Sequence, residues 1–352
     1  MAADGANGRF PVFQFLTGGE KVRFWAGLAM AMAGLSLGWY VLFAGQLGRQ
    51  TPSSRWVAEV RAIKLARAES LAGQRKLVLV SGSNALFGLD SGRLERAWGL
   101  PVVNGAVNAG LLLPYVLESS KALIGPGDVV LMPLEYPMFG NAEALNSIVI
   151  DYVLARDPAY WSGLPWRERL RFLADVEPLR LWKGWRNPPD RSVGQGVYGG
   201  HHVDVRGDQT HSAAADRTDQ ERAELAATRP WRYGRDNPPD PTAWRRLVAY
   251  RNWLQQRGAC LILLPPTLLF DVSYRTDPVE HRFYASLPVQ ARAQGLVYVG
   301  NPYDFMYPRD WYFNTDYHLT AEGRARHTGR VISLLGPDLG RWCGWQGTTA
   351  RP

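Results

Sequence analysis

Short apolar runs alternate with longer amphipathic stretches along residues 76–335. The runs consist mainly of Val, Leu and Ile, which is typical of strands that are buried on both faces. Five strands are expected, at residues 76–80, 101–103, 129–132, 260–264 and 296–299. Apolar positions recur at helical spacing between them, so the pattern predicts an α/β fold with a parallel sheet and helices on both faces.

A longer apolar run precedes this domain, from Phe24 to Gly45, and contains no charged residue. About 20 apolar residues are enough to cross a bilayer as a helix. Trp25, Trp39 and Tyr40 lie near the ends of the run, where interfacial aromatic residues occur. The run is long for a cleaved signal peptide, so we predict a transmembrane helix that stays in the protein. Basic residues flank it on both sides and do not fix its orientation.

The pattern divides the chain into five parts. They are an N-terminal tail (1–23), a transmembrane helix (24–45), a linker helix (46–75), the α/β domain (76–335) and a C-terminal tail (336–352). Residues 186–241 interrupt the domain pattern, because they are rich in Gly, Pro, Asp and Arg and contain Asn-Pro-Pro-Asp twice. We predict a partly irregular surface insertion there, with a lid as one alternative. Residues 151–185 are helical and aromatic-rich, and aromatic residues at helical spacing predict mainly core contacts.

Composition and charge narrow the possible partners. The 352 residues are 46% hydrophobic, which is enough for a large core. The net charge of +8 is spread along the chain and favours contact with an anionic surface such as lipid. No nucleic-acid-binding motif is present, so no nucleic acid partner is expected. The two cysteines, Cys260 and Cys343, either form one disulfide or remain two unrelated thiols.

The insertion also contains residues that can bind metals. They are His201, His202, Asp204 and His211. No helical or strand period gives them the spacing of a ligand set, and the chain has no C-x-x-C pair. We therefore expect neither a metal nor another cofactor.

A serine turn is the first candidate for chemistry. The strand at 76–80 runs into Ser81-Gly82-Ser83-Asn84 and then into a helix. This order places Ser83 at the carboxyl edge of a parallel sheet, where α/β proteins hold their functional residues. The alternative is that the serines only cap the helix. A nucleophilic serine needs a base and an orienting group, and His318 with Asp316 lies near the end of the domain.

Two sequence blocks carry a family resemblance: Gly82-Ser83-Asn84 with Phe-Gly-Leu-Asp-Ser at 87–91, and His318-Leu319 with Glu-Gly-Arg at 322–324. Residues 77–335 resemble the SGNH (GDSL-like) hydrolases. The chain is most similar to their membrane-anchored bacterial branch, which includes the alginate O-acetyltransferases and the lipoteichoic acid D-alanylation protein. This resemblance implies an SGNH-like (flavodoxin-like) three-layer fold, with the globular domain in the periplasm and the helix in the bacterial inner membrane.

The resemblance also implies residue roles. Ser83 is expected to be the nucleophile, His318 the base and Asp316 the group that orients it. In the superfamily this Asp lies three residues before the His, whereas Asp316 lies two before His318. A backbone carbonyl, Glu135 or Asp304 is therefore an alternative orienting group.

The resemblance further implies oxyanion donors after the second strand. The candidates are the backbone N–H groups of Gly105 and Gly110 and the side chain of Asn108. Close packing of a glycine-rich turn is the alternative explanation for the two glycines. Glu135 follows the third strand, where the wider superfamily has an Asn, and either lines the site or has a structural role.

The function implied by the resemblance is that of a membrane-anchored serine O-acetyltransferase. It would modify an extracytoplasmic polysaccharide such as cellulose or alginate, and receive acyl groups from a donor through a membrane-bound O-acyltransferase. Two alternatives remain: a carbohydrate esterase (deacetylase), and a non-catalytic SGNH-scaffold subunit of an exopolysaccharide synthesis or export complex.

Overall fold

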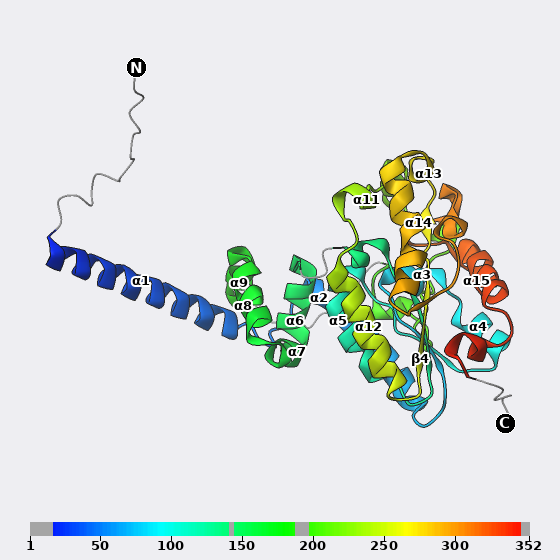
Figure 1. The fold of residues 1–352 in the computed structure, drawn as a ribbon, viewed down its shortest axis with the longest axis horizontal. Helices are drawn as coiled ribbons and strands as arrows, with labels where there is room; N and C mark the ends of the chain where they lie inside the picture. Colours follow the sequence, from blue (N-terminus) through cyan, green and yellow to red (C-terminus); the bar gives the residue numbers. More distant parts are fainter. Residues whose placement is uncertain (1–16, 141–143, 187–196, 346–352) are drawn as a thin grey trace, which may run out of the picture.

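The computed structural model describes residues 17–140, 144–186 and 197–345. Most of the expected N-terminal tail, the first Asn-Pro-Pro-Asp repeat and the last seven residues of the C-terminal tail lie outside these ranges. A long helix, α1 (Gly18–Ala44), projects from the rest of the protein (Figure 1). It begins before the predicted run, and it is the one helix in the described ranges that is long and apolar enough to cross a membrane.

A parallel sheet of five strands forms the centre of the globular part, and the predicted α/β class is confirmed. Its strands are β1 (Leu77–Leu79), β2 (Val102–Asn104), β3 (Val129–Pro133), β4 (Cys260–Leu264) and β6 (Val297–Tyr298). They lie in the order β2-β1-β3-β4-β6, and every neighbouring pair is parallel. This is one of the common orders of doubly wound sheets, in which ligands bind outside the carboxyl ends of the strands where the strand order reverses. That position lies between β1 and β3.

Alternate strand residues fill two separate cores. Val78 and Val130 lie in one core, and Leu79 and Leu131 lie in the other. Each strand is therefore apolar on both faces, because helices cover both sides of the sheet. The first core contains residues of α2 (Pro52–Ser70), α5 (Leu112–Ser120), α12 (Pro241–Gln255) and α14 (Pro278–Ala293). The second contains residues of α3 (Ser83–Gly88), α4 (Ser91–Trp98) and α15 (Ala321–Leu335).

Helix α2 differs from its predicted role as a linker. Val57 and Val60 are each 1% exposed and belong to the first core. Lys64 is also buried, and its ammonium group donates to the backbone oxygens of Ala106 and Gly207. Burial lowers the pKa of Lys64 to about 7. Helix α2 thus packs its apolar stripe on the sheet and is part of the domain.

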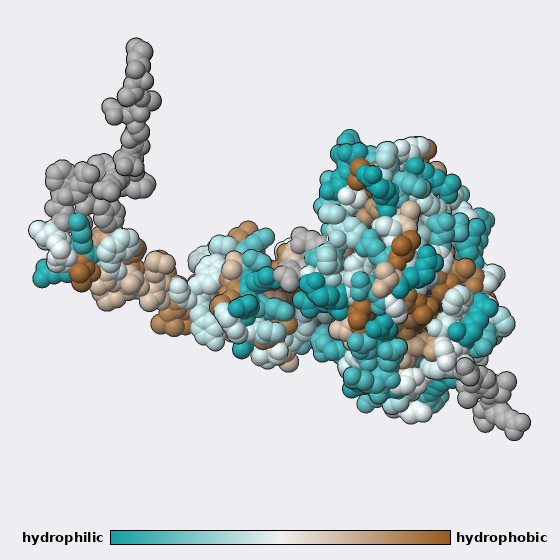
Figure 2. Space-filling view, viewed as in Figure 1, coloured by the Kyte–Doolittle hydropathy of each residue, from teal (hydrophilic) through white to brown (hydrophobic). Residues whose placement is uncertain are grey.

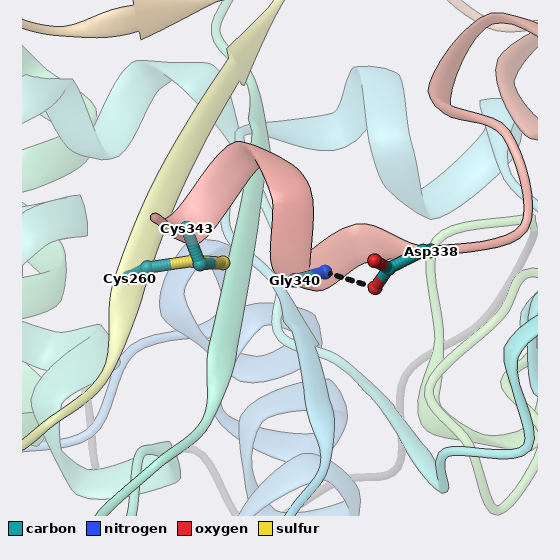
Figure 3. Close-up of a disulfide and its surroundings, with 4 residues drawn as sticks. All are labelled: Cys260, Asp338, Gly340 and Cys343. Atoms are coloured by element: carbon teal, nitrogen blue, oxygen red, sulfur yellow. Dashed lines mark hydrogen bonds between the residues drawn. A yellow bond between two sulfur atoms is a disulfide. The ribbon is translucent and has the colours of Figure 1, made fainter. Parts of the chain in front are cut away.

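The C-terminal segment is joined to the sheet by a disulfide, a possibility that the sequence left open. Cys343, in the 3₁₀ helix η9 (Leu339–Cys343), is bonded to Cys260 at the first residue of β4 (Figure 3). Asp338 accepts a hydrogen bond of 2.8 Å from the backbone N–H of Gly340 at the start of η9. Because Cys260 begins its strand, this bond lies at the opposite end of the sheet from the strand ends that carry Ser83.

Four short helices form a unit beside the end of α1: α6 (Ser147–Arg156), α7 (Pro158–Gly163), α8 (Trp166–Asp175) and α9 (Pro178–Arg186). The prediction that their aromatic residues are mainly core holds for Tyr152, Trp161 and Phe172, which are buried. It is wrong for Trp166, Trp182 and Trp185, which are exposed.

The described part of the insertion is more deeply packed than a surface loop. Its helices are α10 (Asp219–Ala227) and α11 (Tyr233–Asp236). Asp208 is buried and accepts hydrogen bonds from Ser91 and Asn104. Beyond the insertion, α13 (Ser273–Thr276) and a two-stranded parallel sheet of β5 (Leu268–Leu269) and β7 (Met306–Tyr307) complete the domain.

Candidate active site

The nucleophile turn follows β1 directly. Ser83 is the first residue of α3 and is partly exposed, while Gly82 before it has an extended backbone. A Cβ on Gly82 would lie 2.5 Å from a carboxylate oxygen of Glu135 and 2.6 Å from the backbone nitrogen of Ala109. Real Cβ atoms do not approach other atoms so closely, so only glycine lets the turn lie between these two neighbours.

Glu135, which lies just after the end of β3, holds this turn in place. Its carboxylate accepts hydrogen bonds of 2.9 Å from the backbone N–H groups of Gly82 and Asn84, and Oε2 lies 2.9 Å from the Ser81 hydroxyl. Burial raises the pKa of Glu135, while the donating N–H groups act in the opposite direction. Glu135 therefore has a structural role: it supports the backbone on both sides of Ser83.

Asn84 connects the turn to two further segments. Its side-chain amide donates to the Pro133 carbonyl at 2.8 Å. Its Oδ1 accepts from the backbone N–H and the hydroxyl of Thr267, at 3.1 and 2.8 Å. The Thr267 hydroxyl also lies 3.0 Å from the carbonyl of Tyr317, in the loop that carries the histidine. Asn84 and Thr267 thus connect the two halves of the site.

The histidine reaches the serine, as the sequence predicts. His318 Nε2 lies 2.7 Å from Ser83 Oγ, although 235 positions separate the two residues. The backbone N–H of Phe313 donates to the His318 carbonyl at 2.7 Å and closes a short loop before α15. The Phe87 ring is stacked on the imidazole, with centroids 4.1 Å apart and planes 7° apart. The contact with Ser83 therefore restrains the imidazole within its ring plane, and the stacked Phe87 ring restrains it on one face.

The orienting group differs from the expected one. His318 Nδ1 lies 2.8 Å from Oδ1 of Asn314, four residues before it. The Asp316 carboxylate instead accepts a hydrogen bond from the indole N–H of Trp231. Within the described residues, neither the Glu135 side chain nor the Asp304 side chain contacts the imidazole. The loop closed by Phe313 turns Asn314 inward and Asp316 toward the insertion, a result that sequence spacing does not reveal.

The hydrogen-bond pattern defines the tautomer of His318. If Nε2 accepts from the Ser83 hydroxyl, Nδ1 carries the proton and donates to Asn314. Burial lowers the pKa of His318 to about 3, so the imidazole is neutral at neutral pH. A neutral imidazole with a free lone pair toward Ser83 is the form that can accept the hydroxyl proton.

A tyrosine of the insertion completes this chain of contacts. The Tyr198 hydroxyl accepts from the Asn314 amide at 2.8 Å and lies 3.4 Å from His318 Nδ1. Its ring packs on Trp56 and Phe87, with centroids 5.3 and 6.2 Å away. Tyr198 thereby holds the amide of Asn314 with its oxygen toward the imidazole. No sequence pattern predicted its role, because it lies in a segment without a helical or strand period.

The expected glycine donors are engaged elsewhere. The N–H of Gly105 donates to Leu79 O at 2.9 Å, and the N–H of Gly110 donates to Asn108 Oδ1 at 2.7 Å. A Cβ on Gly105 would lie 2.8 Å from Leu79 O, so close packing explains this glycine. The oxyanion prediction is therefore wrong for both glycines, because their N–H groups already have acceptors.

Other donors lie next to the nucleophile. In the described ranges, the N–H groups of Ser83 and Ala109 and the side-chain N–H₂ of Asn108 make no hydrogen bond. Ser83 and Ala109 each begin a helical turn, where an N–H lacks an intrahelical partner. Lys64, through the Ala106 carbonyl, holds the loop that carries Asn108 and Ala109. Ala109 was not predicted as a donor, because a backbone N–H does not depend on residue type.

A cavity of about 500 Å³ begins at this loop. Asn108 forms part of its wall, and residues of α2, α6 and the α8–α9 connection form the rest. Polar groups in the wall include Ser53, Asp151 and Arg180, and Ser53 donates to Asp151 at 2.6 Å. The cavity is large enough for a small organic group.

The histidines of the insertion do not form a metal centre. His202 is stacked between His201 and His211, with ring centroids 4.0 and 4.5 Å away. Burial and the neighbouring histidines lower the pKa of His202. No cluster of three or more His, Cys, Asp or Glu residues in 17–140, 144–186 and 197–345 is arranged to hold a metal ion.

Comparisons of the chain with protein-family models, with curated proteins and with solved structures found no match. The functional interpretation of this protein therefore rests on the geometry around Ser83, His318 and Asn314.

Proposed function

We propose that this protein is a membrane-anchored serine acyltransferase with an SGNH-like fold. One observation carries the proposal: the Ser83 hydroxyl lies 2.7 Å from His318 Nε2, while Nδ1 of the same ring lies 2.8 Å from Asn314 Oδ1. A nucleophile, a base and an orienting group in contact are the arrangement needed for acyl transfer. In this proposal Asn314, rather than Asp316, orients the base.

The reaction has two steps. In the first, Ser83 Oγ attacks the acyl carbonyl, its proton passes to His318 Nε2, and His318 then protonates the departing group of the donor. In the second, His318 takes a proton from an acceptor hydroxyl, whose oxygen attacks the acyl-serine and releases Ser83 Oγ with its proton. Both steps pass through an oxyanion, for which the N–H groups of Ser83 and Ala109 and the amide of Asn108 are candidate donors.

The family resemblance and the α1 helix support the choice of substrates. The acceptor is an extracytoplasmic polysaccharide such as cellulose or alginate, and the acyl group is an acetyl group delivered through a membrane-bound O-acyltransferase. The globular domain lies in the periplasm, with α1 in the bacterial inner membrane. The Cys260–Cys343 disulfide favours this oxidising side.

Asn314 also favours a second candidate, a non-catalytic scaffold subunit of an exopolysaccharide complex. A neutral amide holds the imidazole but does not stabilise its charged form as a carboxylate does. A carbohydrate esterase would use the same residues, with water as the acceptor.

Labelling with a fluorophosphonate probe separates an enzyme from a scaffold. We expect the full chain and Ser70→Ala, a control at an exposed serine of α2, to be labelled. Ser83→Ala should not be labelled, and cells that carry it should lose polymer acetate. Absence of labelling together with unchanged acetate in Ser83→Ala would contradict the catalytic proposal. A gain of acetate in that variant would indicate the esterase.

A further inference from the structure

Helices α8 and α9 have one buried face and one exposed apolar face. Phe172, Val176 and Leu181 pack inward and are at most 3% exposed. The outward side carries large apolar residues that are 44 to 62% exposed: Trp166, Leu170, Leu179, Trp182 and Trp185. Three exposed tryptophans on two consecutive helices are unusual for a surface that meets only water, since exposed large apolar residues of this kind often mark a contact.

This face is joined to the last turns of α1. The indole N–H of Trp39 donates to Leu173 O at 2.7 Å, and that of Trp185 donates to Leu42 O at 2.9 Å. The Phe43 ring packs on Trp161 with centroids 5.1 Å apart. Figure 1 shows α8 and α9 crossing the end of α1 rather than continuing its direction.

Two glycines make this close approach possible. A Cβ on Gly45 would lie 2.1 Å from the Trp185 ring, and a Cβ on Gly184 would lie 1.7 Å from Gln46 Oε1. Gln46 is fully buried and accepts from Arg180 at 2.8 Å. The joint between α1 and α9 is therefore packed and hydrogen-bonded, which fixes α9 at one position along the helix.

That position corresponds to the bilayer surface. A membrane-spanning helix needs about 20 apolar residues, and the uncharged run of this chain starts at Phe24. Twenty positions from Phe24 end near Phe43, beside Leu42 and the α9 contact. Tryptophans concentrate at this depth, where the ring is apolar and the N–H finds a polar partner.

The charge of α9 fits the same partner. Its sequence, PLRLWKGWR, contains three basic residues and no acidic one; Arg180 is paired with Asp151, whereas Arg186 is exposed. Exposed basic residues near a membrane surface are attracted to anionic headgroups. In Figure 2 the apolar surface of α1 ends against this unit, whose visible face mixes hydrophobic and hydrophilic residues. A short helix with large apolar residues on one side and basic residues around them is typical of an interfacial element.

We propose that α8 and α9 lie in the headgroup layer of the same bilayer that α1 crosses, as a second contact between the protein and the membrane. Trp166, Leu170 and Trp182 insert toward the acyl chains, and the exposed Arg186 at the end of α9 meets anionic phospholipid headgroups. Asp175, Glu177 and Arg180 line the cavity that begins at Asn108. The second contact therefore places this part of the cavity wall near the membrane surface.

Depth-dependent fluorescence quenching tests this proposal on the full chain. The two native cysteines are bonded to each other, so an added cysteine can be labelled selectively with a nitrobenzofurazan dye. Trp182→Cys and Leu170→Cys report on the proposed contact. Val289→Cys is the matched control, because it also replaces an exposed apolar residue (57%), on α14 of the globular domain. Each protein is reconstituted into vesicles of phosphatidylethanolamine and phosphatidylglycerol.

In these vesicles, labels at positions 182 and 170 should lose quenching by aqueous iodide and gain quenching by lipids with nitroxide-labelled acyl chains. The label at 289 should show the reverse. Iodide quenching at 182 and 170 equal to that at 289 would overturn the proposal. Protection from iodide without quenching by the lipid probe would also overturn it, since it would indicate cover by protein, such as a second copy. Neither result depends on acyl transfer, so failure here leaves the proposed function intact.

Discussion

The two halves of the candidate site are held in different ways. The sheet holds the nucleophile turn: Ser83 follows β1, and Glu135 from the neighbouring β3 binds the backbone on both sides of it. The histidine loop is held differently. Thr267 and Leu269 bind its backbone at Tyr317 and Asp316, and its side-chain contacts come from Phe87 of α3 and from Tyr198 and Trp231 of the insertion.

This difference shows which parts of the site depend on which parts of the chain. Backbone geometry at a strand end fixes the serine, so neighbouring side chains matter mainly through the backbone that they bind. Side-chain contacts fix the imidazole, and several come from a segment that interrupts the α/β pattern. Substitutions in the insertion should therefore affect catalysis through His318, whereas substitutions around β3 should affect stability and Ser83 together.

The largest effect is expected at Asn314. Asn314→Ala removes the acceptor of the His318 Nδ1 proton, so the ring loses its tautomer and orientation. Loss of the orienting group in triads costs up to about 10⁴-fold in rate, and we expect about 10²- to 10⁴-fold slower acylation by a fluorophosphonate probe. Asp316→Asn is the matched control in the same loop and should retain most of the activity. If Asp316→Asn were acylated more slowly than Asn314→Ala, Asp316 would be the orienting group instead.

Asn314→Asp tests the same contact between position 314 and His318 through the pH dependence of the acylation rate. A carboxylate beside Nδ1 favours the charged imidazole, so it should raise the pKa of His318 from about 3. The wild-type protein should therefore keep a constant acylation rate as the pH falls from 7 to 5. The variant should lose activity in this range, as its histidine becomes protonated. Identical pH profiles would show that position 314 does not face the imidazole.

The second effect concerns the stability of the histidine loop. Burial raises the pKa of Asp316 from 3.8 to about 6, so the folded state binds this proton more tightly than the unfolded state. The resulting stability is complete below pH 3.8 and is lost as the pH rises through about 6. A shift of this size corresponds to about 3 kcal/mol.

Asp316→Asn keeps an acceptor for the Trp231 indole and removes this ionisation. We expect the variant to be more stable than the wild-type protein at pH 7 by up to about 3 kcal/mol, and to lose that advantage near pH 4. Urea unfolding in detergent micelles at the two pH values measures the difference. An advantage that is the same at both pH values would show that the Asp316 pKa is not raised.

A smaller effect is expected at Glu135. Glu135→Gln leaves one acceptor oxygen where two backbone N–H groups, of Gly82 and Asn84, now find carboxylate oxygens. An unsatisfied buried donor costs about 1–3 kcal/mol. Both unfolding free energy and acylation rate should therefore fall. A loss of rate without any loss of stability would instead indicate that Glu135 acts on the reaction itself.

Local patterns were sufficient to predict the five strands of the main sheet, whereas the pairing of Ser83 with His318 was predicted from the family resemblance. Each strand is a continuous apolar run because both faces are covered, and a residue after β1 must lie at the carboxyl edge. The loop before His318 contains two side chains that can accept from Nδ1, Asn314 and Asp316, and only Asp316 was predicted to do so. Which one faces the ring depends on how the Phe313 N–H closes that loop, and spacing alone does not determine this.

The oxyanion loop and the insertion could not be predicted for different reasons. Gly105 and Gly110 are the conspicuous residues of their loop, yet their N–H groups are already bonded. Among the described residues, the unbonded donors of this loop are the side-chain amide of Asn108, which was predicted, and the N–H of Ala109, which was not. Helix α2 has an apolar stripe in the sequence, but its contact with the sheet comes from tertiary packing. The insertion carries Tyr198 without any periodic pattern that could place it.

Tyr198→Phe tests the role of the insertion with the smallest change, one oxygen atom. The ring can still pack on Trp56 and Phe87, so the fold should be retained. The Asn314 amide loses the acceptor that holds its oxygen toward His318, and a lost hydrogen bond of this kind is worth about 1 kcal/mol. We therefore expect about fivefold slower acylation and a fall of about 1 kcal/mol in the free energy of unfolding in urea. In an Asn314→Asp background the hydroxyl no longer selects an amide orientation, so Tyr198→Phe should have little effect there. An equal loss in both backgrounds would mean that Tyr198 contacts the substrate or the imidazole directly, and that the insertion does not act through Asn314.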